Sequence, residues 1–120
     1  MLAGTTICRY LWIMAGIYRL KYDPVGNIMF YVYILQSQKD KELYIGFADN
    51  LRKRLLKHNL GKVFSTKSRR PVKLIYVEIC LNKYDAKQRE KYFKTGVGKR
   101  FIKSRLKHYF NNLTKTTENT

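Results

Sequence analysis

The sequence is short of acidic residues, with 8 aspartates and glutamates against 25 lysines and arginines and a net charge of +17. So large an excess repels itself in a compact fold unless a polyanion screens it. It therefore indicates nucleic acid as the partner, with an anionic membrane surface as the alternative. A highly soluble basic protein without such a partner is the remaining explanation.

Cysteine is also scarce, because the chain has only Cys8 and Cys80, far apart in the sequence. Cysteines that bind a metal come in close pairs, so this spacing argues against a thiolate metal site. Two isolated thiols are typical of a reduced intracellular protein, and we expect a cytoplasmic location. No repeat or low-complexity tract is present.

Long apolar runs are missing too. The most apolar stretch near the start, residues 10–18, is too short for a membrane span, which needs about 20 apolar residues. It resembles the apolar part of a signal peptide, but Arg9 alone is a weak charged flank. Because Met29 directly precedes the first convincing strand, we expect that Met29 is the functional start or that residues 1–28 are a loosely held extension.

A β-hairpin is expected next. Residues 30–36 and 42–47 are rich in aromatic and β-branched side chains, and the polar residues 37–41 suit the connecting loop. Side chains alternate along a strand, which puts Tyr31 and Tyr33 on the same face. We expect these phenols to line a surface while the other face enters a core.

Three helices and one more strand follow. Asp49-Asn50 supplies the N-cap of a basic helix that ends near Gly61, and a basic loop covers residues 62–71. Residues 73–81 form a nearly continuous apolar run, which favours a central strand. Asp85 and Gln88 form a capping box for a helix that runs to about residue 94.

The glycine-containing stretch 95–98 breaks this helix, a further helix is expected over 99–110, and the polar tail 111–120 is predicted to be disordered. The fold class is therefore α+β: a small three-stranded antiparallel sheet flanked by helices, in the order β-β-α-β-α-α. We expect one domain, residues 29–110.

Several polar side chains have a possible chemical role. Arg54 and His58 are four residues apart and so share one helical face, where Arg54 could bind a phosphate through its planar guanidinium. The alternative is an ordinary solvated basic face. Glu90 could hold one hard cation such as Mg²⁺, or simply pair with Lys94 one turn later.

Tyr33 and Tyr44 are open to two interpretations as well. Tyrosine is frequent here, at 10 of 120 residues, so both could be packing residues. Alternatively, one phenol removes a proton from an attacking water, which requires that cationic neighbours lower a pKa normally near 10.

Together these features resemble the GIY-YIG endonuclease superfamily, and in particular its small single-domain bacterial members, akin to the N-terminal nuclease module of the excinuclease C subunit. The first signature is degenerate, as Tyr31-Val32-Tyr33, and the second, Tyr44-Ile45-Gly46, is intact. Segments 51–59, 70–76 and 88–91 follow in the family's order. The tripeptide at residues 16–18 also spells Gly-Ile-Tyr, but it lies too far before Tyr44 for one hairpin.

The resemblance implies a role for each matched residue. Tyr33 corresponds to the phenol that activates water, with His58 as an alternative base, and Tyr44 to the phenol that positions water or phosphate. Arg54 corresponds to the phosphate-binding arginine and Glu90 to the metal ligand. Phe47 departs from the pattern, because excinuclease modules often have lysine there.

The resemblance thus implies a metal-dependent endonuclease that hydrolyses DNA with one Mg²⁺ or Mn²⁺ ion, with a structure-selective role in repair as the expected setting. A non-catalytic module that binds DNA or RNA is the alternative. The residues expected to contact nucleic acid are the exposed cations of the helices and the basic loop: Arg52, Lys53, Lys57, Lys67, Arg69, Arg70, Lys99, Arg100 and Lys103.

Overall fold

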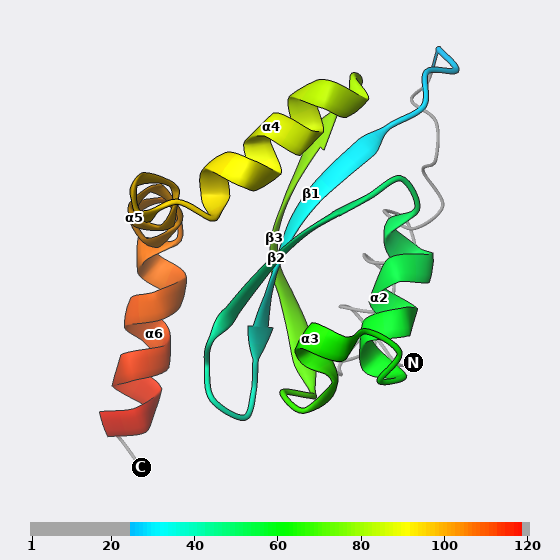
Figure 1. The fold of residues 1–120 in the computed structure, drawn as a ribbon. Helices are drawn as coiled ribbons and strands as arrows, with labels where there is room; N and C mark the ends of the chain where they lie inside the picture. Colours follow the sequence, from blue (N-terminus) through cyan, green and yellow to red (C-terminus); the bar gives the residue numbers. More distant parts are fainter. Residues whose placement is uncertain (1–24, 119–120) are drawn as a thin grey trace, which may run out of the picture.

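A three-stranded antiparallel sheet with helices on both faces forms the body of the protein (Figure 1). The computed structural model describes residues 25–118. The α+β class predicted from the sequence is confirmed. The elements follow one another as β1 (Phe30–Ser37), β2 (Leu43–Ala48), α2 (Leu51–Asn59), α3 (Phe64–Lys67), β3 (Val72–Cys80), α4 (Lys83–Phe93), α5 (Gly96–Arg105) and α6 (Lys107–Glu118).

Strand β1 is central, because the strand order is β2-β1-β3. Tyr33 pairs with Gly46 of β2 on one side and with Val77 of β3 on the other. The prediction that the apolar strand after residue 72 is central was wrong. Its residues are at most partly buried, and apolar content alone does not say which strand of a sheet has neighbours on both edges.

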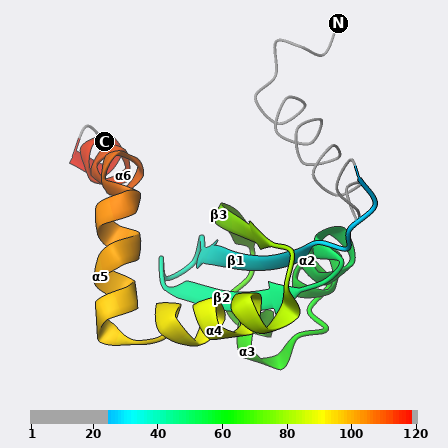
Figure 2. The ribbon, with the colours of Figure 1, turned by 90° about the horizontal axis from the view of Figure 1, so that it is seen from above.

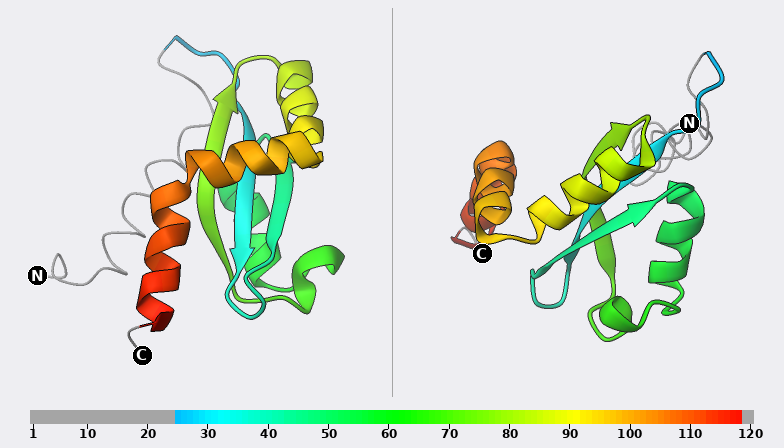
Figure 3. Two further views of the ribbon diagram at one scale, coloured as in Figure 1. Left: turned by 90° about the vertical axis from the view of Figure 1, so that its left-hand side faces the viewer. Right: turned by 45° about the horizontal axis from the view of Figure 1, so that its top comes forward.

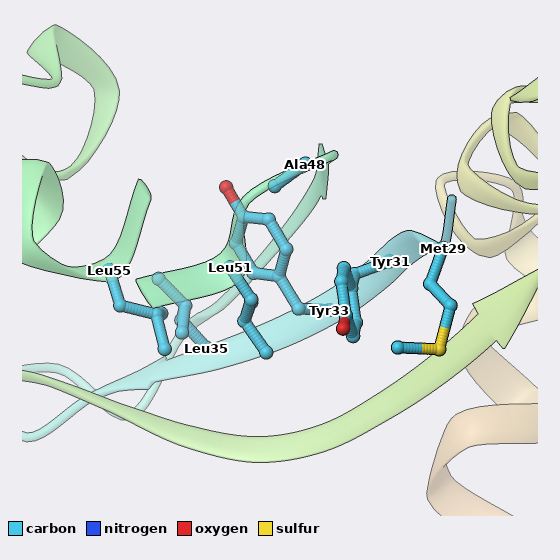
Figure 4. Packing of buried hydrophobic residues seen from close by; sticks show 7 residues of the cluster. All are labelled: Met29, Tyr31, Tyr33, Leu35, Ala48, Leu51 and Leu55. Atoms are coloured by element: carbon cyan, nitrogen blue, oxygen red, sulfur yellow. The ribbon is translucent and has the colours of Figure 1, made fainter. Parts of the chain in front are cut away.

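Side chains alternate across β1 as expected, but both faces are buried. Tyr31 and Tyr33 are 1% and 0% exposed, so the expectation that these phenols line a surface was wrong. Helix α2 covers their face with Leu51 and Leu55, which reach toward the strand in Figure 4. The large phenol rings are thus part of a core that the hairpin sequence alone did not reveal.

The opposite face of β1 carries a second core. Val32 and Ile34 pack there against Ala86 and Phe93 of α4 and against Ile102 of α5. Figure 1 shows α4 on one side of the sheet and α2 on the other, and seen from above α4 runs along the strands (Figure 2). The sheet therefore separates α2 from α4 and α5. Residues of α2 and residues of these two helices lie on opposite faces of the sheet.

Side-chain caps fix where the helices begin. Asn50 accepts a hydrogen bond from the Lys53 amide, as predicted, and Gly61 follows α2 with a φ of 75°. The cap of α4 is Asn82 and not Asp85, which lies inside the first turn. Thr95 caps α5, so the predicted break falls just before residue 96 and the two following glycines belong to the helix.

The C-terminal part differs most from the prediction. In place of one helix ending at residue 110 and a disordered tail, α5 ends at Arg105 and α6 continues to Glu118 (Figure 3). Contacts with the sheet hold α6 in place: the Tyr109 hydroxyl donates to Gln36 Oε1 at 2.6 Å, and Lys73 lies over the Tyr109 ring. Gln36 and Lys73 are far from Tyr109 in the sequence, so the local sequence of the C-terminal segment does not reveal these contacts.

The start of the chain lies mostly outside the described residues, which begin at residue 25, so the predictions for residues 1–24 are not addressed. Met29 is buried in the core beside Tyr31. Among the helices that the structure describes, none combines the length and apolar character needed to cross a membrane.

We expect Gly98→Ala to destabilise the fold. A Cβ at residue 98 would collide with the Tyr92 carbonyl oxygen and lie 2.7 Å from the Phe93 Cα, and both are backbone atoms that cannot swing away. The expected loss is at least about 1–3 kcal/mol in urea unfolding followed by circular dichroism. Gly96→Ala is the matched control, because its Cβ would meet only a flexible arginine at 3.6 Å. Equal stabilities of the two variants would contradict the close approach.

Candidate active site

The Tyr33 hydroxyl is the meeting point of the predicted site residues. It accepts a hydrogen bond from Arg54 Nε at 3.2 Å and lies 2.9 Å from His58 Nε2. Arg54 and His58 lie on successive turns of α2 and on the same side of it, as their spacing predicted. Helix α2 packs on the face of β1 that carries Tyr33. Three residues from two elements thus form one hydrogen-bonded chain.

Gly46 allows the Tyr33 ring to occupy this place. The two residues are partners in the β1–β2 register, and a Cβ at residue 46 would collide with Cζ and Oη of the Tyr33 ring. Tyr44 lies two residues earlier in β2, on the same face, with its ring 6.3 Å from that of Tyr33. The intact second signature is therefore explained by packing as well as by chemistry.

Thr66 completes the chain, and sequence reasoning missed it. Its hydroxyl lies 2.7 Å from His58 Nδ1, and both residues are fully buried or nearly so, at 0% and 1% exposure. Thr66 belongs to the short helix α3, inside the stretch predicted as a basic loop. Nothing in that stretch singles out a threonine, because the contact depends on how α3 folds back onto α2.

The direction of these hydrogen bonds follows from burial. The buried Tyr33 hydroxyl needs an acceptor for its proton, and the acceptor that the structure shows is His58 Nε2. His58 is then neutral, with its proton on Nδ1 donated to Thr66. The order of donation runs from Arg54 to Tyr33, then to His58 and finally to Thr66.

The pKa values agree with a neutral pair. Burial raises the pKa of Tyr33 to about 12, with the charges of Tyr44 and Glu90 adding to this and Arg54 opposing it. Burial also lowers the pKa of His58 to about 4, helped by the neighbouring Arg54 charge. Near neutral pH, neither the phenol nor the imidazole is therefore charged.

Arg54 and Tyr44 are the parts of the site that a ligand can reach. Both are partly exposed, whereas Tyr33 and His58 are 0% exposed. The hydrogen bond to Tyr33 raises the pKa of Arg54, against the effect of burial, so the guanidinium keeps its charge. The Tyr44 ring packs edge-on against His58 with the centroids 4.9 Å apart.

Glu90 approaches the site from the other side of the sheet. It belongs to α4, and its charge is close enough to contribute to the raised pKa of Tyr33. The ion pair with Lys94, considered from the sequence as an alternative, is present: Lys94 Nζ lies 3.4 Å from Glu90 Oε2. For the other carboxylate oxygen, the structure shows no hydrogen bond within the described residues.

Glu90 is the carboxylate at this site that could bind a metal ion. Within residues 25–118 there is no group of three or more histidine, cysteine, aspartate or glutamate side chains that could hold a metal. A small hard cation such as Mg²⁺ keeps several waters and needs only one or two protein carboxylates. The partly buried Glu90 carboxylate, 18% exposed, fits this requirement.

The cations predicted to bind nucleic acid do not form one patch. One group lies on or near α2 and the other on α5, on opposite faces of the sheet (Figure 1). Arg69 pairs with Asp40 at 3.5 Å, and Arg70 donates to the Lys67 carbonyl at 2.9 Å. These two arginines therefore hold the loop together. Arg69 is partly buried, and the other predicted contacts are exposed: Arg52, Lys53, Lys57, Lys67, Arg70, Lys99, Arg100 and Lys103.

Acid should destabilise the fold through His58. Between the ordinary pKa of 6.5 and about 4, the unfolded chain binds a proton that the folded protein does not. Stability therefore falls as the pH drops through this window, by up to about 3 kcal/mol from this group. We expect a shallower pH dependence of urea unfolding in His58→Gln, while the exposed-residue control His108→Gln keeps the wild-type slope. Identical slopes in all three proteins would contradict the burial argument.

Comparison with known proteins agrees with this geometry. Residues 29–101 match the family described as the GIY-YIG catalytic domain. The match leaves out residues 16–18, so the early Gly-Ile-Tyr tripeptide is a coincidence, as the hairpin argument predicted. No solved structure matches the chain.

Relatives of similar size come from several bacteria. A UPF0213 protein of Clostridium perfringens is 49% identical over 67 residues, which is 55% of this chain and 71% of its own. A UPF0213 protein of Staphylococcus saprophyticus is 46% identical over 66 residues, 54% of this chain and 79% of its own. Another from Pediococcus acidilactici is 40% identical over 86 residues, 69% of this chain and 83% of its own. These names state no activity.

The matched region covers more than half of the chain and contains Tyr33, Tyr44, Arg54, His58 and Glu90, the residues predicted to be catalytic. The family is one of nucleases that bind DNA and generally use divalent metal ions. The chain belongs to the GIY-YIG family.

Proposed function

We propose that the protein is an endonuclease that hydrolyses phosphodiester bonds in DNA with one divalent metal ion, Mg²⁺ or Mn²⁺. The observation that carries the proposal is the convergence of Arg54 and His58 on the Tyr33 hydroxyl, with the Tyr44 ring packed against His58. The Glu90 charge also acts on the same phenol. A packing role alone would not need a charged guanidinium on a buried phenol.

Arg54 would bind the scissile phosphate. Its guanidinium is partly exposed, charged and already fixed at one nitrogen by Tyr33. A fork of N–H donors matches two phosphate oxygens, and it opposes the negative charge that builds up as water attacks. Tyr44, also partly exposed, would donate its hydroxyl to the phosphate or to the attacking water.

Tyr33 and His58 would share the removal of the proton from water. Both side chains are 0% exposed, but the Tyr33 hydroxyl contacts the partly exposed Arg54 and so lies next to the place proposed for the phosphate and the attacking water. With a pKa of about 12 the phenol is neutral near pH 7, so it can accept a proton only as it gives up its own. In a concerted transfer the phenol takes the water proton on Oη as its own proton passes to His58 Nε2, 2.9 Å away. Thr66 keeps the imidazole oriented for this transfer.

Glu90 would hold the metal ion through its carboxylate. A bound divalent cation supplies positive charge for the leaving 3′ oxygen. Lys94 would have to share or release the carboxylate when the ion binds, and its exposed side chain can do so. A structure-selective role in DNA repair is the setting that we propose for this activity.

Arg54→Ala and Glu90→Gln should each lose about 10²–10³ in cleavage rate, because each removes a preorganised charge contact that acts in the transition state. Nicking of supercoiled plasmid, with Mg²⁺ and with a chelator, measures this. Circular dichroism should show both variants folded, since neither side chain is part of a core cluster.

Matched controls are available for both substitutions. Arg52→Ala removes the same charge from α2 at an exposed residue, and Glu42→Gln removes an exposed carboxylate; each should change the rate only a few-fold. If the site variants cleave like these controls, the assignment is wrong. If the wild type binds DNA but never cleaves it with Mg²⁺ or Mn²⁺, the protein is a binding module.

A further inference from the structure

A groove of about 730 Å³ lies between helices α5 and α6 and the hairpin formed by β1 and β2. We call it the hairpin–α6 groove. Figure 1 shows α6 beside this hairpin, and the hydrogen bond from Tyr109 to Gln36 joins the two. The volume lies within the range of small-molecule sites, roughly 300–1,000 Å³, so the groove can take several side chains of another molecule.

The floor of the hairpin–α6 groove is apolar. Leu43 and Ile45 come from β2, and Phe110 and Leu113 come from α6. Ile45 is buried in the second core, while the other three side chains are partly exposed. Because side chains alternate along β2, Tyr44 lies on the opposite face of the sheet. A ligand in the groove would therefore leave the candidate active site open.

Lysines surround this floor. Lys99 and Lys103 lie one turn apart on α5, and Lys107 begins α6. All three are exposed, and the structure shows no ion pair between them and any residue in the range 25–118. Lys41 adds a cation from the hairpin, against one carboxylate in the lining, that of Glu42. The groove thus combines an apolar floor with an excess of positive charge.

This charge argues against an occupant from the protein itself. A second copy would bring the same net charge of +17. Residues 1–24, which lie outside the described part of the chain, carry Arg9, Arg19 and Lys21 against Asp23, so their charge does not match either. The complementary occupant is an acidic segment of another protein.

DNA would match the lysines but not the floor. Phosphates are bound by cations, and unpaired bases stack on aromatic rings, of which this lining has one, that of Phe110. The aliphatic side chains of Leu43 and Leu113 instead favour an apolar partner surface. An amphipathic helix has one, because its apolar side chains recur at i, i+3 or i+4 and i+7, which leaves the other side of the helix for carboxylates.

We propose that the hairpin–α6 groove binds an acidic amphipathic helix of a partner protein. The apolar side of that helix would lie on the floor of the groove, and its carboxylates would face the three lysines of α5 and α6. The proposal goes beyond the proposed nuclease function and does not depend on it. The partner would hold the protein on this face of the sheet, while the face that carries Tyr33 stays free.

A designed peptide tests the proposal with the full chain. The probe is a fluorescein-labelled helix of leucine, alanine and glutamate with all leucines on one side, and the control peptide has the same composition with its leucines spread around the helix. Fluorescence anisotropy should show about tenfold tighter binding of the amphipathic peptide, because only this peptide can place its leucines together on the floor. Equal affinities for the two peptides would overturn the proposal.

Two variants test where the peptide binds. Leu113→Asn removes apolar surface from the floor, and Lys103→Glu reverses one charge beside it. Each should weaken binding of the amphipathic peptide about three- to tenfold. The matched controls are Leu81→Asn and Lys91→Glu, at exposed residues outside the groove, and each should change the affinity less than about twofold. Melting curves establish that every variant is folded.

Two further results would count against a helix in this groove. If the two groove variants bind the peptide as tightly as their controls, the peptide binds elsewhere and the proposal is wrong. If both groove variants weaken the binding of a labelled DNA duplex by the same factor as that of the peptide, the groove is a DNA surface and the proposal is equally overturned.

Discussion

The buried hydroxyl of Tyr33 is the group around which the rest of the site is organised. A phenol oxygen removed from water needs partners for its proton and its lone pairs, and His58 and Arg54 provide them. This requirement fixes the rotation of α2 against the sheet, since both residues must face β1. It also explains Gly46, whose missing side chain leaves room for the ring. Packing and chemistry thus place the same demands on these residues.

Residues from helices on opposite faces of the sheet meet around the edge formed by β2. Helix α2 covers one face and α4 the other, yet Arg54 and Glu90 both act electrostatically on Tyr33. A cavity lined by Arg54 and by lysines of both helices also reaches from α2 to α4 around the end of this strand. A substrate that follows the edge could therefore contact the groups that we propose as catalytic and the cationic cavity at once.

Local patterns predicted local structure well. The hairpin, the Asn50 cap and the shared helical face of Arg54 and His58 depend on neighbours within a few residues, and the structure confirms them. The central position of β1, the Thr66 contact and the extent of α6 were missed, because each depends on residues far apart in the sequence. For the same reason, the sequence did not show that the guanidinium groups of residues 69 and 70 have partners within the fold, and their contact with nucleic acid stays a prediction. The role of Glu90 was open from the sequence, and its pairing with Lys94 leaves that role a proposal.

Strand β1 is buried on both faces, and this has a consequence for how the protein can change over time. The strand that contributes to both cores also carries the phenol that we place at the reaction centre. A substitution that repacks either side of it shifts that oxygen relative to its partners. A core substitution that leaves stability unchanged could still change the rate of the proposed reaction. Selection for activity would then constrain the residues around β1 as strongly as selection for stability does.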